Sequence, residues 1–244
     1  MTALTRRSLV ASLAAASAVL DCPLCLAKPI TYVKNVLCAT RSFSGLAIGD
    51  VLKTTGDRDL DDSLVSEMTK QSAFFGYRPA FILYSGGEKN AAATPDAWPE
   101  IPATQGTILY NIEMLQEQLK ASTWGGAILA GVIAHEFGHI YQNFSGQMSK
   151  LKALDSTVKF IELHADYLSG FYMGGKFGSI DVKPYADAFF KIGDYGFSEP
   201  DHHGTPEERY FVLKAGYNLR LRSRDLHVSQ AAREGESFLK EYIH

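Results

Sequence analysis

Residues 124–144 constrain the fold of this chain more strongly than any other segment. They are apolar for most of their length, and charged residues occur only near the C-terminal end. A segment of this length that is apolar on all sides is typical of a helix buried in a protein core. Its small residues allow neighbouring elements to approach closely; they are Gly125, Gly126, Ala127, Ala130, Gly131 and Ala134. We therefore expect a long central helix here.

The charged end of this helix carries His135-Glu136-Phe137-Gly138-His139, an H-E-x-x-H pattern. Because residues four apart share a helix face, both imidazoles can reach one metal ion. Glu136 then points beside that ion. Burial of two histidines and a glutamate in an apolar helix is unfavourable unless these side chains bind a cation. The motif predicts His135 and His139 as metal ligands and Glu136 as the general base of a metal-dependent hydrolase.

A third ligand is required, because a catalytic zinc usually takes three protein ligands and leaves the fourth position to water. Residues 154–172 show helical spacing of apolar residues, and Glu162 and Asp166 lie four apart within them. We expect Glu162 to be the third ligand of one zinc ion (Zn2+) per chain. Asp166 would accept the second N–H of a ligating histidine and fix its tautomer. His164 is the alternative third ligand, although it points to a different helix face.

The two motifs resemble the gluzincin metallopeptidases of the HtpX-like and CAAX-prenyl-protease-like group, which pair H-E-x-G-H with a downstream E-x-x-A-D. Residues 134–140 and 162–166 carry this likeness. Related bacterial neutral zinc metallopeptidases have similar Glu-Leu-x-Ala-Asp and His-Gly-Thr segments. The order of a segment at 90–93, a strand at 107–110 and the motif helix also follows the peptidase domain of the family. The resemblance implies a zincin-like metallopeptidase fold.

The segment His203-Gly204-Thr205-Pro206-Glu207-Glu208-Arg209 is similar to a family segment with a His, a Pro and a following Arg. The resemblance implies that His203 is a second donor to the oxyanion of the tetrahedral intermediate, with His202 as the alternative. Arg209 is expected to have a structural or supporting role. Thr205 followed by Pro206 and two acids also predicts a helix start. Under that alternative interpretation the histidine pair lies in an exposed loop.

Departures from the family pattern limit what the resemblance implies. The membrane helices of the namesake proteins are missing, Ala92 stands where a bulky residue is common, and Gly instead of Pro follows His203. These differences are compatible with a soluble, exported peptidase domain but not with CAAX processing. The family also implies that the strand at 107–110 offers its edge to an extended polypeptide substrate.

Residues 1–27 are expected to be an export signal. Arg6 and Arg7 precede an apolar run at 11–20, which gives the charged and apolar regions of such a signal and is too short to span a bilayer. The adjacent arginines resemble a twin-arginine signal. Its removal would leave one metallopeptidase domain at 28–244, periplasmic or extracellular and without a transmembrane anchor. The alternative is an amphiphilic helix that stays attached.

The composition excludes several classes of protein. The chain has 24 basic and 27 acidic residues and a formal charge of −3, so a nucleic-acid partner is not expected. Three cysteines in 244 residues are too few for a disulfide framework. Cys22 and Cys25 lie within the expected signal, and Cys38 is expected to be buried rather than reactive.

The rest of the chain predicts an α+β, mostly helical fold with a small β-sheet. The expected elements are a helix capped by Asp61 or Asp62 and ended by Gly76, strands at 81–84 and 107–110, a loop at 88–104 and a helix at 112–120.

Three functions fit these observations. The leading hypothesis is a zinc-dependent peptidase with a polypeptide substrate. One alternative is a zinc hydrolase that acts on a non-peptide bond, and the other is a binding or chaperone-like protein with a structural zinc. Glu136 weighs against the last, because a structural site needs no general base.

Overall fold

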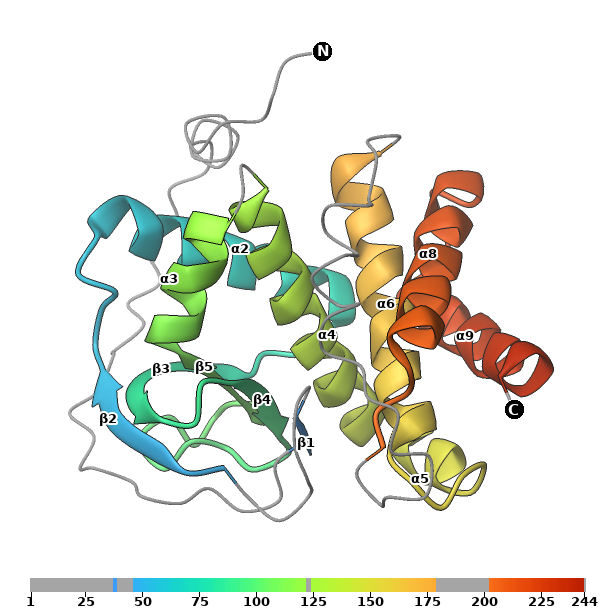
Figure 1. Cartoon of the computed structure of the whole chain (residues 1–244), viewed down its shortest axis with the longest axis horizontal. Helices are drawn as coiled ribbons and strands as arrows, with labels where there is room; N and C mark the ends of the chain where they lie inside the picture. The colour runs from blue at the N-terminus through green and yellow to red at the C-terminus, as the bar shows by residue number, and fades with distance from the viewer. Residues whose placement is uncertain (1–36, 39–45, 122–123, 179–201, 244) are drawn as a thin grey trace.

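The structure, a computed structural model, describes residues 37–38, 46–121, 124–178 and 202–243. The expected export signal, with Cys22 and Cys25, lies outside these residues. Within them the protein is α+β and mostly helical, as the sequence predicts. The β-sheet lies at one side of the molecule and the helices α6, α8 and α9 lie at the other (Figure 1).

The sheet has five strands in the order β1-β4-β5-β3-β2. β3 and β5 run parallel, and the other neighbouring strands pair antiparallel. The strands are β1 (Leu37–Cys38), β2 (Ile48–Leu52), β3 (Ala80–Gly87), β4 (Ala91–Thr94) and β5 (Thr107–Asn111).

Strand β4 lies within the segment 88–104 expected to be a loop, so that prediction was wrong for residues 91–94, whereas residues 95–104 form turns and irregular backbone. All four of its residues are buried, and it pairs with β5 on one side and β1 on the other. Alanine has little preference for strands, so pairing with its neighbours stabilises this strand more than local propensity does. The Tyr84 hydroxyl lies 2.7 Å from the Glu88 carbonyl oxygen and 3.0 Å from that of Asn90, which fixes the turn from β3 into β4.

The prediction that the strand at 107–110 offers an edge to a substrate was also wrong. β5 is the central strand of the sheet, and its backbone pairs with β4 on one side and β3 on the other. A short apolar strand has the same sequence pattern at the centre of a sheet as at its edge. Its place therefore depends on pairing partners that the pattern does not specify.

Helix α2 (Arg58–Phe75) begins earlier than expected. Its N-cap is Asp57, whose side chain accepts hydrogen bonds from the backbone N–H groups of Asp59 and Leu60. Asp61, expected as the cap, instead accepts a hydrogen bond from the Thr55 N–H at 2.8 Å. The helix ends at Gly76, as expected, with a left-handed backbone conformation (φ 78°) that favours glycine.

Helix α4 (Gly125–Ser145) follows α3 (Ile112–Ala121) and confirms the expected long central helix. Every residue from 127 to 142 is buried. The helix lies between the sheet and α6 (Lys159–Phe177), so it contacts both halves of the molecule (Figure 1). Among the described residues, no helix combines the length and the apolar character needed to cross a membrane.

Helix α6 begins later than the expected residue 154. It follows α5 (Gln147–Lys152) and a turn in which the Asp155 carboxylate accepts a hydrogen bond from the Thr157 N–H at 2.6 Å. Where α6 crosses α4, the two backbones approach closely. A Cβ added at Gly138 would lie 3.0 Å from the Cα of Ala165. The absence of a side chain at Gly138 therefore lets the two helices bring their polar residues together.

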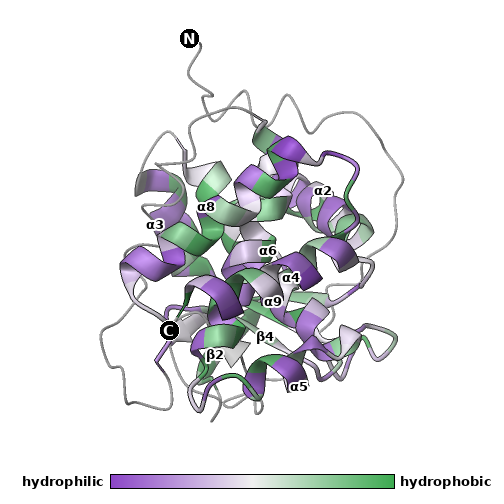
Figure 2. Cartoon of the chain, turned by 90° about the vertical axis from the view of Figure 1, so that its right-hand side faces the viewer, coloured by the Kyte–Doolittle hydropathy of each residue, from purple (hydrophilic) through white to green (hydrophobic). Residues whose placement is uncertain are grey.

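Helices α8 (Pro206–Arg222) and α9 (Val228–Tyr242) cover the other side of α6 (Figure 1). Thr205 caps α8, and Glu208 completes a capping box, which confirms the expected helix start. Hydrophilic and hydrophobic residues alternate along outer helices such as α3 and α5 (Figure 2), the pattern of helices with one apolar side.

Candidate metal centre

The H-E-x-x-H residues lie in the second half of α4, in the interior of the protein. His135, Glu136 and His139 are each 0% exposed. The Nε2 atoms of the two histidines are 3.0 Å apart, because a spacing of four residues stacks them on one helix face. The local structure is therefore the one that the motif predicts.

Helix α6 places the Glu162 carboxylate against both imidazoles. Oε2 lies 3.2 Å from Nε2 of His135, and Oε1 lies 3.3 Å from Nε2 of His139. In a tetrahedral zinc site with bonds of about 2.0–2.1 Å, neighbouring ligand atoms are about 3.3 Å apart. Among the described residues, these three form a buried group that could bind a metal ion. Their spacing already matches one coordination sphere.

Unsatisfied carboxylate oxygens show that these residues fit a cation. Both oxygens of Glu136, and Oε2 of Glu162, are buried and have no hydrogen-bond partner. Buried carboxylates are normally paired, hydrogen-bonded or bound to metal, because their desolvation is otherwise uncompensated. Oε2 of Glu162 lies 3.2 Å from Nε2 of His135, within reach of an ion pair when that imidazole is protonated. A bound cation would satisfy this oxygen.

The electrostatics of the cluster also favour a positive charge. Burial would lower the pKa of His135, but the hydrogen bond to Asp166 and the charges of Asp166 and Glu162 raise it to about 9. Burial would raise the pKa of Glu162, but His139 and His135 hold it well below its ordinary value. Without a metal ion, a proton on His135 therefore supplies the positive charge at neutral pH.

Glu136 differs from Glu162 in its acidity. Burial raises the pKa of Glu136 to about 7, even though the neighbouring His135 and His139 act in the opposite direction. A carboxyl group with a pKa near neutrality can accept and release a proton at physiological pH. This property distinguishes Glu136 from a carboxylate that only binds metal.

Asp166 and Arg209 form a charged support behind His135. Asp166 Oδ1 lies 2.8 Å from Nδ1 of His135, so the hydrogen bond expected of Asp166 is present. Arg209, from α8, donates from Nε to Oδ2 at 2.7 Å and from its terminal nitrogen to Oδ1 at 2.8 Å. Burial would raise the pKa of Asp166, but Arg209 and His135 lower it. With Nδ1 of His135 engaged by a carboxylate, Nε2 faces the cluster.

His164 lies outside the ligand group, so the alternative assignment of a third ligand was wrong. Its Nε2 lies 2.9 Å from the Ala232 carbonyl oxygen, and its Nδ1 lies 3.2 Å from Nε2 of Gln142. Burial lowers the pKa of His164 to about 4, which keeps it neutral. Both ring nitrogens of His164 therefore have partners outside the group formed by His135, His139 and Glu162.

The sequence reasoning missed Gln142, which is fully buried and lies 3.0 Å from Nδ1 of His139 through its Oε1. The available signal was its position three residues after His139, on the same face of the helix. A glutamine at the end of an apolar helix did not stand out beside the charged residues of the motif.

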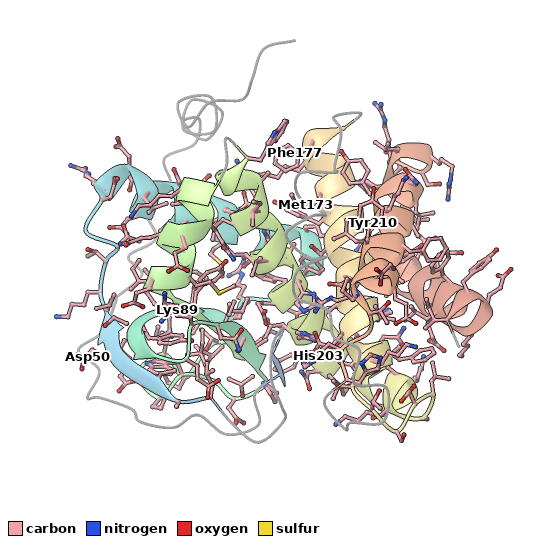
Figure 3. The ribbon with its side chains drawn as sticks, in the orientation of Figure 1. Asp50, Lys89, Met173, Phe177, His203 and Tyr210 are labelled. Atoms are coloured by element: carbon pink, nitrogen blue, oxygen red, sulfur yellow. The ribbon has the colours of Figure 1, made fainter. Side chains whose placement is uncertain are left out.

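His203 and His202 are buried, at 5% and 2% exposure, so the exposed-loop interpretation was wrong. They lie on the segment that leads into α8, and Figure 3 shows His203 beside the lower part of α6. A Cβ added at the next residue, Gly204, would lie 2.9 Å from the Leu163 side chain, so this segment contacts α6 one residue after Glu162. The catalytic role of His203 stays a prediction.

Comparison of the chain with protein-family models, curated proteins and solved structures finds no match. The functional assignment therefore depends on the residues of the centre and their geometry.

Proposed function

We propose that the chain is a zinc-dependent peptidase with a zincin-like fold and with Glu136 as the general base. The observation that carries the proposal is Glu136 itself, a buried carboxylate without a hydrogen-bond partner, in the same helix turn as two metal-facing imidazoles. A purely structural metal site has no use for such a group. The resemblance to gluzincin metallopeptidases supports the same assignment.

The donor set favours zinc. Two imidazoles and one carboxylate are ligands that zinc accepts, and three protein ligands leave a position for water. Zinc bound there would lower the pKa of a water molecule toward neutrality and polarise the carbonyl group of the scissile bond. The chain would hold the ion through Nε2 of His135, Nε2 of His139 and the Glu162 carboxylate.

The residues around this set have separate tasks in the proposal. Glu136 takes a proton from the attacking water and delivers it to the leaving amine. Asp166, held by Arg209, keeps His135 in the tautomer with Nε2 toward the cluster. His203 donates a hydrogen bond to the oxyanion that develops on the substrate.

The proposed substrate is flexible or unfolded polypeptide outside the cytoplasm, in the periplasm or the extracellular space. The location follows from the resemblance of residues 1–27 to a twin-arginine signal. Since β5 is internal to the sheet, its edge is not part of the proposed substrate site.

The proposal is tested by digestion of casein and of a peptide library with the purified chain, with and without a chelator. Glu136→Gln keeps the size of the side chain and removes the base, so we expect zinc to be retained and hydrolysis to fall by at least about 100-fold. Glu67→Gln is the matched control, because Glu67 is another buried glutamate, bonded to Tyr172 and Lys176 in α6. This control should keep its activity.

Undiminished hydrolysis by Glu136→Gln would remove Glu136 from the proposed role. A panel of esters run beside the peptides separates the peptidase from a hydrolase of non-peptide bonds. Cleavage of esters without cleavage of any peptide would contradict the peptidase assignment while leaving the metal site in place.

A further inference from the structure

Gln142 makes three contacts that together fix its orientation. Its Oε1 lies 3.0 Å from Nδ1 of His139. Its Nε2 lies 2.7 Å from the Ile161 carbonyl oxygen and 3.2 Å from Nδ1 of His164. Gln142, His139 and His164 are each 0% exposed, so no solvent competes for these bonds.

The Ile161 carbonyl sets the direction of this network, because a carbonyl oxygen can only accept a hydrogen bond. The amide nitrogen of Gln142 must therefore face Ile161, which turns the amide oxygen toward His139. An amide oxygen only accepts, so Nδ1 of His139 must carry the hydrogen. Nε2 of His139 is then left with its lone pair toward the ligand cluster.

The other end of the network is set in the same way by helix α9. The Ala232 carbonyl accepts from Nε2 of His164, so that nitrogen carries the hydrogen. Nδ1 of His164 is then an acceptor, and it receives the second amide hydrogen of Gln142. Both ends of the network therefore require the same orientation of the Gln142 amide.

We propose that Gln142, held by Ile161 and His164, is a positioning residue that fixes His139 in its metal-binding tautomer. The proposal rests on the metal site of the proposed function. The same turn of α6 then supports two ligands. Glu162 would bind the metal directly, and the carbonyl group of Ile161 orients Gln142, the partner of His139. The two histidine ligands thus have different supports, a charged one at His135 and a neutral one at His139.

The neutral support agrees with the charge of the centre. Glu136, Glu162 and Asp166 are acidic, and Arg209 is the basic group that pairs with Asp166. A divalent cation would balance the remaining two negative charges. An amide at position 142 orients His139 without adding another negative charge to this buried set.

The test measures the zinc affinity of the full chain by competition with a chelator. Gln142→Leu replaces the amide side chain with an apolar side chain of similar size and removes all three bonds. We expect it to weaken zinc binding by about 10–100-fold, the range for outer partners of metal ligands. Gln142→Glu restores an acceptor for Nδ1 of His139 but cannot donate to Ile161, so it should recover most of the zinc affinity while the metal-free protein is less stable.

Ser169→Ala is the matched control. The Ser169 hydroxyl donates to the Gly131 carbonyl at 2.8 Å, so it also provides a buried hydrogen bond between α6 and α4, to a backbone group outside the proposed ligand set. Its zinc affinity should equal that of the wild type. The visible spectrum of the Co²⁺-loaded protein, which reports ligand geometry, should change in Gln142→Leu and stay like the wild type in the Ser169→Ala control.

Wild-type zinc affinity in Gln142→Leu would overturn the inference. A Gln142→Glu variant that binds zinc as weakly as Gln142→Leu would also overturn it, because the loss would then not depend on an acceptor for Nδ1 of His139. If Gln142→Leu does not fold, Gln142→Glu decides alone, and loss of its zinc affinity relative to Ser169→Ala overturns the inference. A wild-type chain that binds no zinc would instead remove the proposed function itself.

Discussion

Residues 127–134 and 135–142 of α4 are all buried, but these two halves differ in chemistry. Residues 125–134 are glycine, alanine and aliphatic residues that pack into the main apolar core with α2, α3 and the sheet. The second half, from residue 135, contains four buried polar side chains, His135, Glu136, His139 and Gln142. Three of them, His135, His139 and Gln142, contact residues of α6. One continuous helix therefore combines an apolar anchor with a polar centre.

This difference shows how a buried polar group identifies a site. Burial of the apolar half stabilises the fold by about 25 cal/mol for each Å² removed from water. Burial of the polar half is unfavourable unless each group finds a partner. Asp166 supplies one for His135 and Gln142 supplies one for His139, whereas Glu136 has none in the described structure. In the proposed function, a water molecule on the bound metal ion is the partner of Glu136.

The largest effect is expected from Glu162→Ala, which removes one of three ligands from the polar half. Two imidazoles alone hold zinc weakly, so affinity should fall by more than about 100-fold, beyond the range for outer partners. Zinc content after equilibrium dialysis measures this loss. Zinc occupancy equal to that of the wild type would exclude Glu162 as a ligand.

A large effect of a different kind is expected from Ile133→Ala in the apolar half. Ile133 is 0% exposed in the main core, so the cavity should lower the free energy of unfolding by about 2–5 kcal/mol. Urea denaturation of the metal-free protein measures the change. Zinc affinity should stay close to that of the wild type, and a drop comparable with that of Glu162→Ala would show that the two halves are not separable.

A smaller effect is expected from Gly138→Ala, because Gly138 lies where the polar half of α4 packs against α6. The new Cβ would lie 3.0 Å from the Cα of Ala165 and push α6 away. Overpacking costs about 1–3 kcal/mol, which exceeds the gain of about 1 kcal/mol from helix propensity. The midpoint temperature of thermal unfolding should decrease slightly. Zinc affinity should also decrease slightly, because Glu162 moves with α6. A variant that is stabilised, with unchanged zinc affinity, would contradict the close approach.

The last expected effect is the release of a proton from the polar half when zinc binds. The raised pKa of His135, about 9, means that its imidazole is protonated in the metal-free protein at pH 7. A metal ligand must be neutral, so zinc binding should release a proton, and affinity should weaken as the pH falls below 9. Calorimetry in two buffers of different ionisation enthalpy measures the released proton. Equal proton release at pH 7 and well above pH 9 would contradict the assignment to His135.

The sequence predicts the centre better than it predicts the sheet, for a physical reason. His135, His139, Glu162 and Asp166 sit at helical spacings, so local periodicity alone places each pair on one face. Their convergence depends on the packing of α4 against α6, which the chemistry of the residues suggests but spacing does not prove.

Other features depend on three-dimensional pairing and were missed or misplaced. The alanines of β4 become a strand because β5 lies beside them, and β5 is central because β4 and β3 both pair with it. Gln142 matters because the Ile161 carbonyl of another helix meets its amide. The strand pairings and the contact of Gln142 with Ile161 leave no signal in local sequence, where only propensity and periodicity can be recognised. Periodicity places Gln142 on the helix face of His139, but it does not show what the amide meets on α6.

X-ray absorption spectroscopy of the zinc-loaded full chain tests most directly whether His135, His139 and Glu162 share one metal ion. We expect one zinc per chain, with two imidazole nitrogens and at least one oxygen at about 2.0–2.1 Å. The imidazole signal should weaken in both His135→Ala and His139→Ala. Failure to bind stoichiometric zinc, or a spectrum that neither substitution changes, would contradict the shared site.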